Sequence, residues 1–328
     1  RCTMKDAWGR TIEYVRLSLT DACNFCCPYC RPAEITPQSQ TQLLSVDEWM
    51  IVLGAFHRLG VKAVRLTGGE PLLYPHIEEL LTRINQTGWF EDISMTTNGS
   101  LLAPRAAKLK ELGLNRVNIS LDSLDSDAFA LCVGKANQLD SVLNGIQSAI
   151  DTGFTSVKIN TVLSRHWTDE EVRALLTYVE TWPVIWRFIE YMPFQGDAFH
   201  GPTFEEWKSQ LERVSDGILT ENHDVYGFGP ATYYNLPSGK EIGFIFSMSH
   251  SYCDTCNRVR LTSDGQMRLC LLRDDEADLV SLVRQGLSEA ELASHIEWAL
   301  QRKQERHDGM TMDQIGRASC RERVSSPV

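Results

Sequence analysis

Short runs of β-branched and apolar residues alternate with helical patterns over the first 192 residues. The predicted strands are Tyr14–Thr20, Ala63–Thr67, Asp92–Thr97, Arg116–Leu121, Ser156–Leu163 and Val184–Met192. Between the first two strands, apolar residues recur at helical spacing from Val46 to Leu59, and Ser45 with Glu48 forms a capping box. Strands that alternate with helices indicate parallel β/α architecture, so we expect an α/β fold of six strands and five helical crossovers.

Six β/α units are too few for a closed eight-stranded barrel, and periodicity does not distinguish an open curved sheet from a flat doubly wound one. In both arrangements the reactive residues gather at the C-terminal ends of the strands. The distinctive segments follow strands in this way: cysteines begin at Cys23, Gly-Gly-Glu-Pro begins at Gly68, and Asn-Gly begins at Asn98. We therefore expect the site at this end of the sheet.

The alternation ends after Met192, and a looser region precedes a second cysteine cluster and a helical stretch over residues 288–302. We therefore expect a β/α domain over residues 1–192 and a smaller C-terminal region over residues 193–316. The Arg- and Ser-rich residues 317–328 show almost no core-forming pattern, so we expect disorder there, and their composition favours a non-native extension.

Composition and charge narrow the function classes. With 43% hydrophobic and 23% charged residues, the chain has the composition of an ordinary folded protein. The net charge of −11 argues against general binding to DNA or RNA, so an anionic ligand requires a local basic pocket. No apolar stretch is long enough for a membrane-spanning helix and no secretory signal is visible, so we expect a cytoplasmic protein with no membrane partner.

The first cysteine cluster has Cys23, Cys27 and Cys30 at Cys-x3-Cys-x2-Cys spacing, on a loop that leaves a strand. Three thiolates in one loop can hold three irons of a four-iron, four-sulfur cluster and leave the fourth iron open. An open iron can chelate a small molecule through its amine and carboxylate. The alternative is a structural zinc knuckle, which needs a fourth protein ligand and usually paired Cys-x2-Cys units.

The second cluster, Cys253, Cys256 and Cys270, again offers three thiols. We favour the hypothesis that these thiols hold a second iron–sulfur cluster with an open iron. The alternative is a zinc site, for which His250 would supply the fourth ligand. Arg258 and Arg260 follow on one face of a predicted extended segment, and guanidinium groups suit phosphate recognition. A solvated charged strand is the alternative for these two arginines.

The first cysteine loop and the Gly-Gly-Glu-Pro segment together resemble the radical S-adenosylmethionine (radical SAM) enzymes. The Cys-Asn-Arg-x-Arg segment at Cys256, the Thr-Thr-Asn-Gly segment ending at Gly99 and the segment Val117–Ser123 extend the resemblance to the GTP 3′,8-cyclase family of molybdenum cofactor biosynthesis. This likeness runs from about Val15 to Ile315. It implies a partial (β/α)6 barrel of parallel strands, with a C-terminal region that carries a second iron–sulfur cluster.

The resemblance assigns a role to each matching residue. The cysteines Cys23, Cys27 and Cys30 would hold one [4Fe-4S] cluster, and Cys253, Cys256 and Cys270 a second, whose open iron coordinates guanine. The residues implied for S-adenosylmethionine are Tyr29, Gly68, Gly69, Glu70, Asn98, Ser120 and Met192. The residues implied for GTP are Arg16, Arg65, Thr96, Lys158, Arg258 and Arg260. Arg187 and Gly316 match further functional positions, the latter near the family's usual Gly-Gly end.

The implied reaction converts GTP to (8S)-3′,8-cyclo-7,8-dihydroguanosine 5′-triphosphate, the first step of the pathway. It requires a reduced electron donor such as flavodoxin or ferredoxin, and its metabolic partner is the downstream cyclic pyranopterin synthase. A homodimer is expected. The remaining alternatives are a radical SAM paralogue that acts on another nucleotide or a peptide, and a non-catalytic zinc or redox-sensing protein.

Four positions depart from the family pattern. Ala63 replaces a usual lysine, although the adjacent Lys62 offers a substitute, and Cys26 replaces a usual basic residue. Arg31 stands in place of a methionine, and Arg317 follows Gly316 where the family has Gly-Gly. Bulk and charge at Arg317 predict poor entry of the tail into the site, so we expect the departure at the tail to affect activity most.

Overall fold

The computed structural model describes residues 3–30, 43–192, 201–224, 226–270 and 276–306. Its parallel strands are β1 (Tyr14–Ser18), β2 (Ala63–Thr67), β3 (Asp92–Thr97), β4 (Arg116–Ser120), β5 (Ser156–Val162), β6 (Ile185–Ile189), β9 (Glu241–Ile245) and β10 (Arg258–Leu261). Its antiparallel strands are β7 (Thr220–Asn222), β8 (Thr232–Asn235), β11 (Gln266–Arg268) and β12 (Glu276–Asp278).

The helices are α1 (Val46–Arg58), α2 (Ile77–Thr87), α3 (Ala106–Glu111), α4 (Ser126–Val133), α5 (Leu139–Thr152), α6 (Asp169–Thr181), α7 (Phe204–Val214), α8 (Leu279–Arg284) and α9 (Glu289–Leu300). Short 3-10 helices occur at η2 (Pro71–Leu73) and η3 (Cys253–Thr255). The predicted capping box at α1 is confirmed, because Ser45 accepts from the Glu48 backbone while Glu48 binds the Ser45 backbone. No helix among the described residues is long and apolar enough to cross a membrane.

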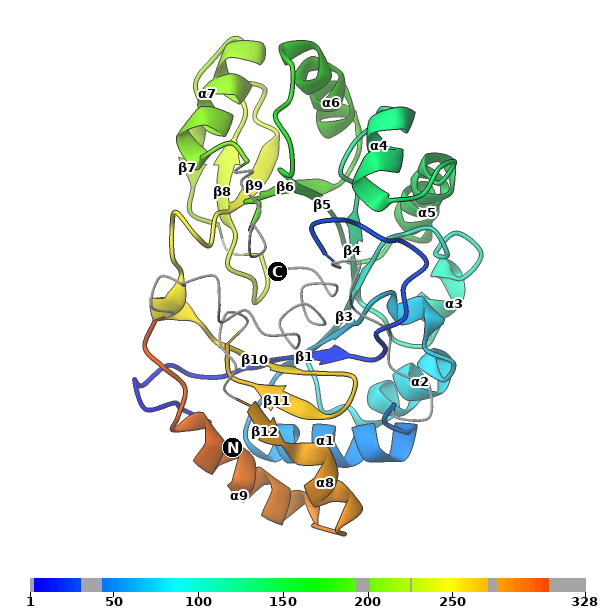
Figure 1. Cartoon of the computed structure of the whole chain (residues 1–328), viewed down its shortest axis with the longest axis vertical. Helices are drawn as coiled ribbons and strands as arrows, with labels where there is room; N and C mark the ends of the chain where they lie inside the picture. Colours follow the sequence, from blue (N-terminus) through cyan, green and yellow to red (C-terminus); the bar gives the residue numbers. More distant parts are fainter. Residues whose placement is uncertain (1–2, 31–42, 193–200, 225, 271–275, 307–328) are drawn as a thin grey trace.

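The described strands form one open sheet in the order β12-β11-β10-β1-β2-β3-β4-β5-β6-β9-β8-β7. Figure 1 shows these strands curving around a centre, with the helices of the β/α units outside them. The six predicted strands and their five helical crossovers are confirmed, and the curved, open sheet agrees with the predicted partial barrel.

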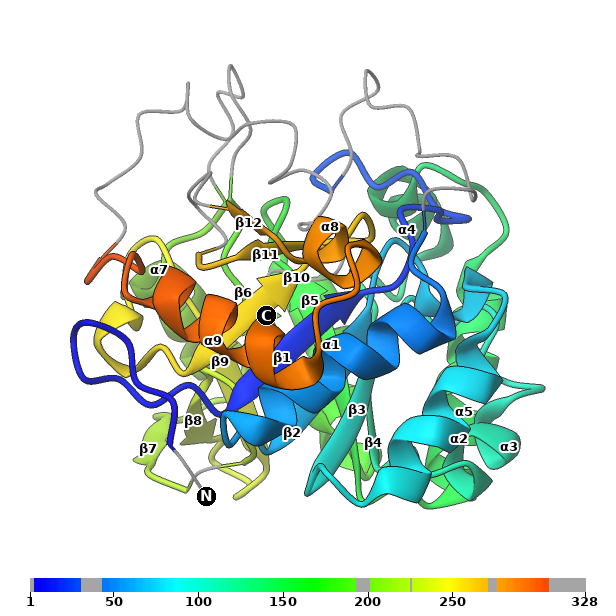
Figure 2. The ribbon, with the colours of Figure 1, turned by 90° about the horizontal axis from the view of Figure 1, so that it is seen from below.

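The C-terminal residues extend the same sheet at both edges. β9 pairs parallel with β6, and β10 pairs parallel with β1. Helix α9 packs against α1 on the outside of the sheet, and Figure 2 shows the two helices side by side. The predicted division at residue 192 therefore separates segments of sequence that contribute strands to one sheet.

Side-chain alternation gives the sheet two different faces. Apolar side chains such as Val15, Leu17, Val64 and Leu66 belong to the hydrophobic core between sheet and helices. The intervening side chains, including Arg16 and Arg65, point to the opposite face because successive side chains of a strand alternate. We call this face the lumen. The interior of a closed β/α barrel is filled by apolar side chains, whereas the lumen of this sheet carries cationic side chains such as Arg16 and Arg65.

Candidate functional site

Two glycines bring the turn after β2 against the loop that leaves β1. A Cβ atom on Gly69 would lie 2.2 Å from the Ala22 carbonyl oxygen, and one on Gly68 would lie 2.6 Å from that of Thr20. The Gly69 amide donates to the Thr20 carbonyl at 2.6 Å, and the Glu70 amide donates to the Ala22 carbonyl at 2.8 Å. The structure therefore joins the Gly-Gly-Glu-Pro segment directly to the start of the first cysteine loop.

Glu70 organises the next strand end from a fully buried position. Its carboxylate accepts from the Thr97 hydroxyl at 2.7 Å, the Asn98 amide at 2.7 Å and the Leu72 amide at 3.1 Å. Burial raises the pKa of Glu70 to about 7, against the effect of these donors. The carboxylate thus ties together the ends of β2 and β3, while the Asn98 side chain donates to Asn24 at 2.8 Å.

The first cysteine loop is anchored at several points. Cys23, Cys27 and Cys30 are each partly exposed, and the Cys30 amide donates to the Cys27 carbonyl at 3.0 Å. The Asn98 side-chain Nδ2 donates to the Cys23 sulfur at 3.9 Å. Burial, the neighbouring Cys30 and Asp122 raise the pKa of the Cys27 thiol. The Cys26 side chain, in the same loop, is exposed.

Tyr29 connects this loop to β4. Its hydroxyl donates to Asp122 at 2.5 Å, and the same carboxylate accepts from the Val162 amide at 2.8 Å. Burial raises the pKa of Asp122 to about 6. Asp122 was not among the predicted site residues. Its position two residues after Ser120, just beyond the end of β4, could have indicated a site residue, because reactive residues gather at the C-terminal ends of such strands.

The predicted phosphate-binding side chains converge on the lumen. The register pairs Arg16 on β1 with Arg65 on β2 and Arg260 on β10, and all three are buried. Burial alone would raise the pKa of Tyr14, but Arg65, Arg16 and the other guanidiniums around it hold that pKa below its ordinary value. The Arg258 guanidinium lies 5.3 Å from the centre of the Tyr252 ring, and its Nε and Nη1 atoms have no hydrogen-bond partner among the described residues.

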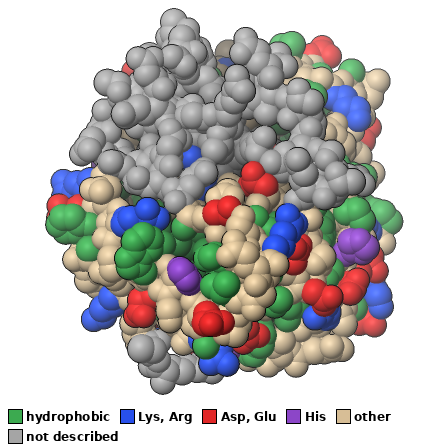
Figure 3. Space-filling model, turned by 60° about the horizontal axis from the view of Figure 1, so that its bottom comes forward, with side chains coloured by type: hydrophobic (Ala, Val, Ile, Leu, Met, Phe, Trp, Pro, Cys, Tyr) green, Lys and Arg blue, Asp and Glu red, His purple; other side chains and the backbone are tan. Residues whose placement is uncertain are grey.

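Lys158 on β5 and Arg187 on β6 extend this cationic lining. Burial, Arg187 and Arg116 lower the pKa of Lys158 to about 6, and the ammonium donates to the Tyr226 carbonyl at 3.0 Å. Burial and nearby Arg65 lower the pKa of Arg187 to about 10. On the outer face in Figure 3, by contrast, acidic and basic side chains are interspersed. The chain thus combines a net negative charge with a lumen that attracts anions.

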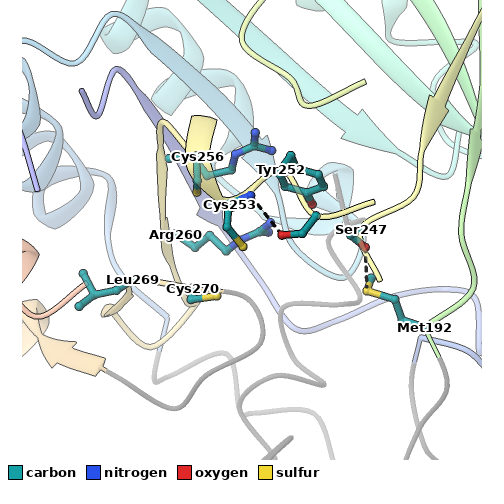
Figure 4. Close-up of a pocket in the computed structure, with 10 residues that line it drawn as sticks. Met192, Ser247, Tyr252, Cys253, Cys256, Arg260, Leu269 and Cys270 are labelled. Atoms are coloured by element: carbon teal, nitrogen blue, oxygen red, sulfur yellow. Dashed lines mark hydrogen bonds between the residues drawn. The ribbon is translucent and has the colours of Figure 1, made fainter. Parts of the chain in front are cut away.

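The second cysteine set lines a pocket beside these arginines. A hairpin of β10 and β11 brings Cys256 and Cys270 together, and Cys253 lies on η3. The pocket is lined by Met192, Ser247, Ser251, Tyr252, Cys253, Cys256, Arg258, Arg260, Leu269 and Cys270 (Figure 4). Burial alone would raise the pKa of Cys256, but Lys303 and Arg258 hold it below its ordinary value.

The structure brings most predicted site residues together around the lumen and its C-terminal end. Thr96 is buried with its hydroxyl unpaired among the described residues, and the Ser247 hydroxyl lies 3.5 Å from the Met192 sulfur. Ala63 shares the lumen face with Arg65, whereas Lys62 pairs with Glu13 at 2.6 Å. Gly316, Arg31 and Arg317 lie outside the described residues. Within the described ranges, no group of three or more His, Cys, Asp and Glu side chains is placed to hold a single metal ion.

Comparison with known proteins gives the family. A model of the "Radical SAM superfamily" matches residues 17–179, and one of "Molybdenum Cofactor Synthesis C" matches residues 184–309. The chain is 39% identical to a GTP 3′,8-cyclase of Pelotomaculum thermopropionicum, over 95% of this chain and 100% of that protein. It is 42% identical to a GTP 3′,8-cyclase of Trichodesmium erythraeum, over 93% of this chain and 99% of that protein. The chain belongs to the GTP 3′,8-cyclase family.

Membership of the GTP 3′,8-cyclase family makes the chain a radical SAM enzyme of molybdenum cofactor biosynthesis, as the motifs predicted. It implies S-adenosylmethionine and one [4Fe-4S] cluster as cofactors. Among solved structures, Streptococcus suis SuiB bound to S-adenosylmethionine shares the fold with a TM-score of 0.63 at 16% identity, covering 83% of this chain and 64% of SuiB. The partial-barrel fold that the motifs implied is therefore confirmed.

Proposed function

We propose that this chain converts GTP to (8S)-3′,8-cyclo-7,8-dihydroguanosine 5′-triphosphate, with GTP held in the lumen between the two cysteine sets. The observation that carries the proposal is the register of β10 with β1 and of β1 with β2. This register places Arg260 beside Arg16 and Arg65, so the second cysteine pocket and a row of guanidiniums border the same space.

The first cysteine loop fits a cluster with an open iron. Its three thiols come from one loop, and the turn at Gly69 passes close against that loop. Cys23, Cys27 and Cys30 would hold the cluster, while Tyr29, Gly68, Gly69, Glu70, Asn98, Ser120 and Met192 would surround S-adenosylmethionine. When bound, the cluster and S-adenosylmethionine would supply radical chemistry at the 3′ position of the GTP ribose, with the electron coming from a reduced flavodoxin or ferredoxin.

The lumen would fix the triphosphate through its cations. Arg16, Arg65, Arg258 and Arg260 present guanidinium groups, and Lys158 adds an amine whose pKa a bound polyanion would raise. The Thr96 hydroxyl and two Arg258 nitrogens are buried and have no hydrogen-bond partner within the described ranges, so a ligand can satisfy them. Arg187 is buried beside this row and would add a further guanidinium for the triphosphate.

The second cysteine pocket would orient the guanine. Cys253, Cys256 and Cys270 would hold a second [4Fe-4S] cluster, which would supply an iron site for the base. Fixing both ends of GTP matters because the reaction joins two atoms of one molecule, which requires the ribose and base to be held in a reactive geometry. We also propose a homodimer and a metabolic link to a cyclic pyranopterin synthase.

The test is product analysis of the anaerobically reconstituted protein with a reductant, S-adenosylmethionine and GTP. The proposal predicts methionine, 5′-deoxyadenosine and the cyclised nucleotide in amounts that rise together. The matched control is the same reaction with ATP in place of GTP. If the site recognises guanine, ATP should give no cyclised nucleotide. Cleavage of S-adenosylmethionine without any cyclised nucleotide would contradict the proposed substrate.

A further inference from the structure

Asn118 on β4 lies between two buried arginines of the lumen. With its amide turned as the neighbouring donors require, its oxygen accepts from Arg187 Nη2 at 2.9 Å and also from Arg65 Nη1. Asn118 is 2% exposed, Arg65 5% and Arg187 1%. One amide oxygen therefore bridges a guanidinium from β2 and a guanidinium from β6.

The remaining contacts of these arginines are also with neutral groups. Ser94 accepts from Arg65 Nε at 3.1 Å, and Asn160 accepts from Arg187 Nε at 2.9 Å. Neither arginine forms an ion pair with any residue that the structure describes. Asn118, Asn160 and Ser94 thus fix the direction of both guanidiniums without supplying a negative charge.

A different arrangement occurs nearby on the same strands. Arg116, two residues before Asn118, forms an ion pair with Asp92, two residues before Ser94. There a carboxylate holds the guanidinium and cancels its charge, whereas at Asn118 an amide holds two guanidiniums and leaves both charges in place. Because a buried charge interacts more strongly than an exposed one, this choice of acceptor decides how strongly the lumen attracts an anion.

We propose that Asn118 is a positioning residue whose neutral amide fixes Arg65 and Arg187 for the triphosphate of GTP while preserving their charge. The inference rests on the proposed function, because it assigns the anion as the triphosphate of that substrate. It predicts that the amide, and not only the shape of the side chain, is required at this position.

Asn118→Asp is the decisive variant because it keeps the size of the side chain and adds one negative charge. The carboxylate would pair with both guanidiniums, so we expect affinity for GTP to fall at least about tenfold. Affinity for uncharged guanosine should change little, so the ratio of the two affinities should fall by a similar factor. The dependence of GTP affinity on salt should also become shallower, since the net charge of the lumen is reduced.

The matched control is Asn144→Asp, which makes the same chemical change on the exposed face of α5 and should leave both affinities unchanged. Asn118→Ala is a second test: it removes the acceptor without adding charge, and we expect GTP affinity to fall about threefold, less than in Asn118→Asp. This variant also decides the matter if Asn118→Asp fails to fold, because unchanged GTP affinity in Asn118→Ala would overturn the proposal.

Equilibrium dialysis of the reconstituted holoenzyme with GTP and guanosine gives the required ratios. An unchanged ratio in Asn118→Asp would overturn the proposal, as would equal losses for GTP and guanosine, which indicate a packing defect. Arg65→Ala separates this failure from failure of the proposed function. If Arg65→Ala weakens GTP binding and Asn118→Asp does not, only the role of Asn118 is wrong; if Arg65→Ala has no effect, the proposed substrate site itself is wrong.

Discussion

The two cysteine sets contribute three thiols each but differ in the charges that act on Cys27 and Cys256. At Cys27 of the first set, burial, Cys30 and Asp122 raise the pKa of the thiol, and Tyr29 donates to the same Asp122. At Cys256 of the second set, Lys303 and Arg258 hold the pKa of the thiol below its ordinary value against the effect of burial. A cysteine of the first set thus has an acidic neighbour, and a cysteine of the second set has cationic neighbours.

This difference matches the charges of the two proposed small molecules. S-adenosylmethionine carries a sulfonium and an amine, so a site with carboxylates and amides suits it better than a row of guanidiniums. GTP is a polyanion, which the arginines beside the second set attract. The surroundings of the thiols, more than their spacing, therefore support assigning the proposed cleavage site to the first set and the proposed substrate site to the second.

The largest expected effect comes from removing the first cysteine set. Replacing Cys23, Cys27 and Cys30 with alanine should abolish reductive cleavage of S-adenosylmethionine and remove about half of the bound iron, if each set holds one cluster. Iron analysis and detection of 5′-deoxyadenosine measure the two effects. The same replacement at Cys253, Cys256 and Cys270 is the matched control and should abolish cyclised product while some cleavage remains. Cleavage that survives the first replacement would contradict the assignment of the sets.

The next effect concerns the cations beside the second set. Arg258→Ala removes a buried guanidinium, two of whose nitrogens have no partner among the residues that the structure describes. A charge-assisted contact is worth about 1.5–3 kcal/mol, so GTP affinity should fall at least about tenfold. Binding of S-adenosylmethionine to the same variant serves as the internal reference. Equal weakening of both ligands would show that Arg258 supports the fold rather than the triphosphate.

A smaller effect is expected where the two glycines meet the first loop. In Gly69→Ala the new Cβ atom would lie 2.2 Å from the Ala22 carbonyl oxygen, so the loop must move. We expect a severalfold loss of S-adenosylmethionine cleavage and a fall in the free energy of unfolding of about 1–3 kcal/mol. Gly239→Ala is the control for lost stability alone, because its φ of 89° disfavours alanine while a Cβ there meets nothing within 4 Å; its cleavage activity should stay normal. Normal cleavage by Gly69→Ala would show that the close approach of the turn at Gly69 to the Ala22 carbonyl is not required for activity.

The smallest effect is a pH dependence at Lys158. Because its pKa is lowered to about 6, the amine is largely neutral at neutral pH, and a bound triphosphate should raise that pKa and draw a proton onto it. GTP affinity should therefore weaken as the pH rises from roughly 6 to 8, by at most about tenfold per pH unit. The phosphates of GTP also titrate in this range, so Lys158→Arg, which stays charged, is the reference in calorimetry. Identical pH profiles for the two proteins would refute this role.

Much of this arrangement could be predicted from local sequence patterns. The six strands and the capping box at Ser45 depend on residues within a few positions of one another, so periodicity and side-chain chemistry reveal them. The extended segment predicted at Arg258 and Arg260 is likewise confirmed as β10. The places of β9 and β10 in the sheet could not be predicted in this way, because each pairs with a strand that is distant in sequence.

The buried contacts of Asn118 and Asn160 could not be predicted for a related reason. Polar residues at alternate positions of a strand usually face solvent, so the pattern at Asn118, Asn160 and Arg187 was compatible with an exposed sheet face. Only the curvature of the sheet turns that face into a buried lumen. The cysteine sets were easier to predict, because their thiols lie within short segments, although the surroundings that distinguish them come from distant residues such as Lys303.

The most direct test of the account follows one hydrogen atom between the two regions. GTP deuterated at C3′ of the ribose is incubated anaerobically with reduced enzyme and S-adenosylmethionine, and the 5′-deoxyadenosine formed is analysed by mass spectrometry. If the lumen holds GTP between the two cysteine sets, the 5′-deoxyadenosine must carry deuterium, and its amount must match that of the cyclised nucleotide. 5′-Deoxyadenosine without deuterium, formed while GTP is bound, would contradict the placement of the substrate between the two cysteine sets.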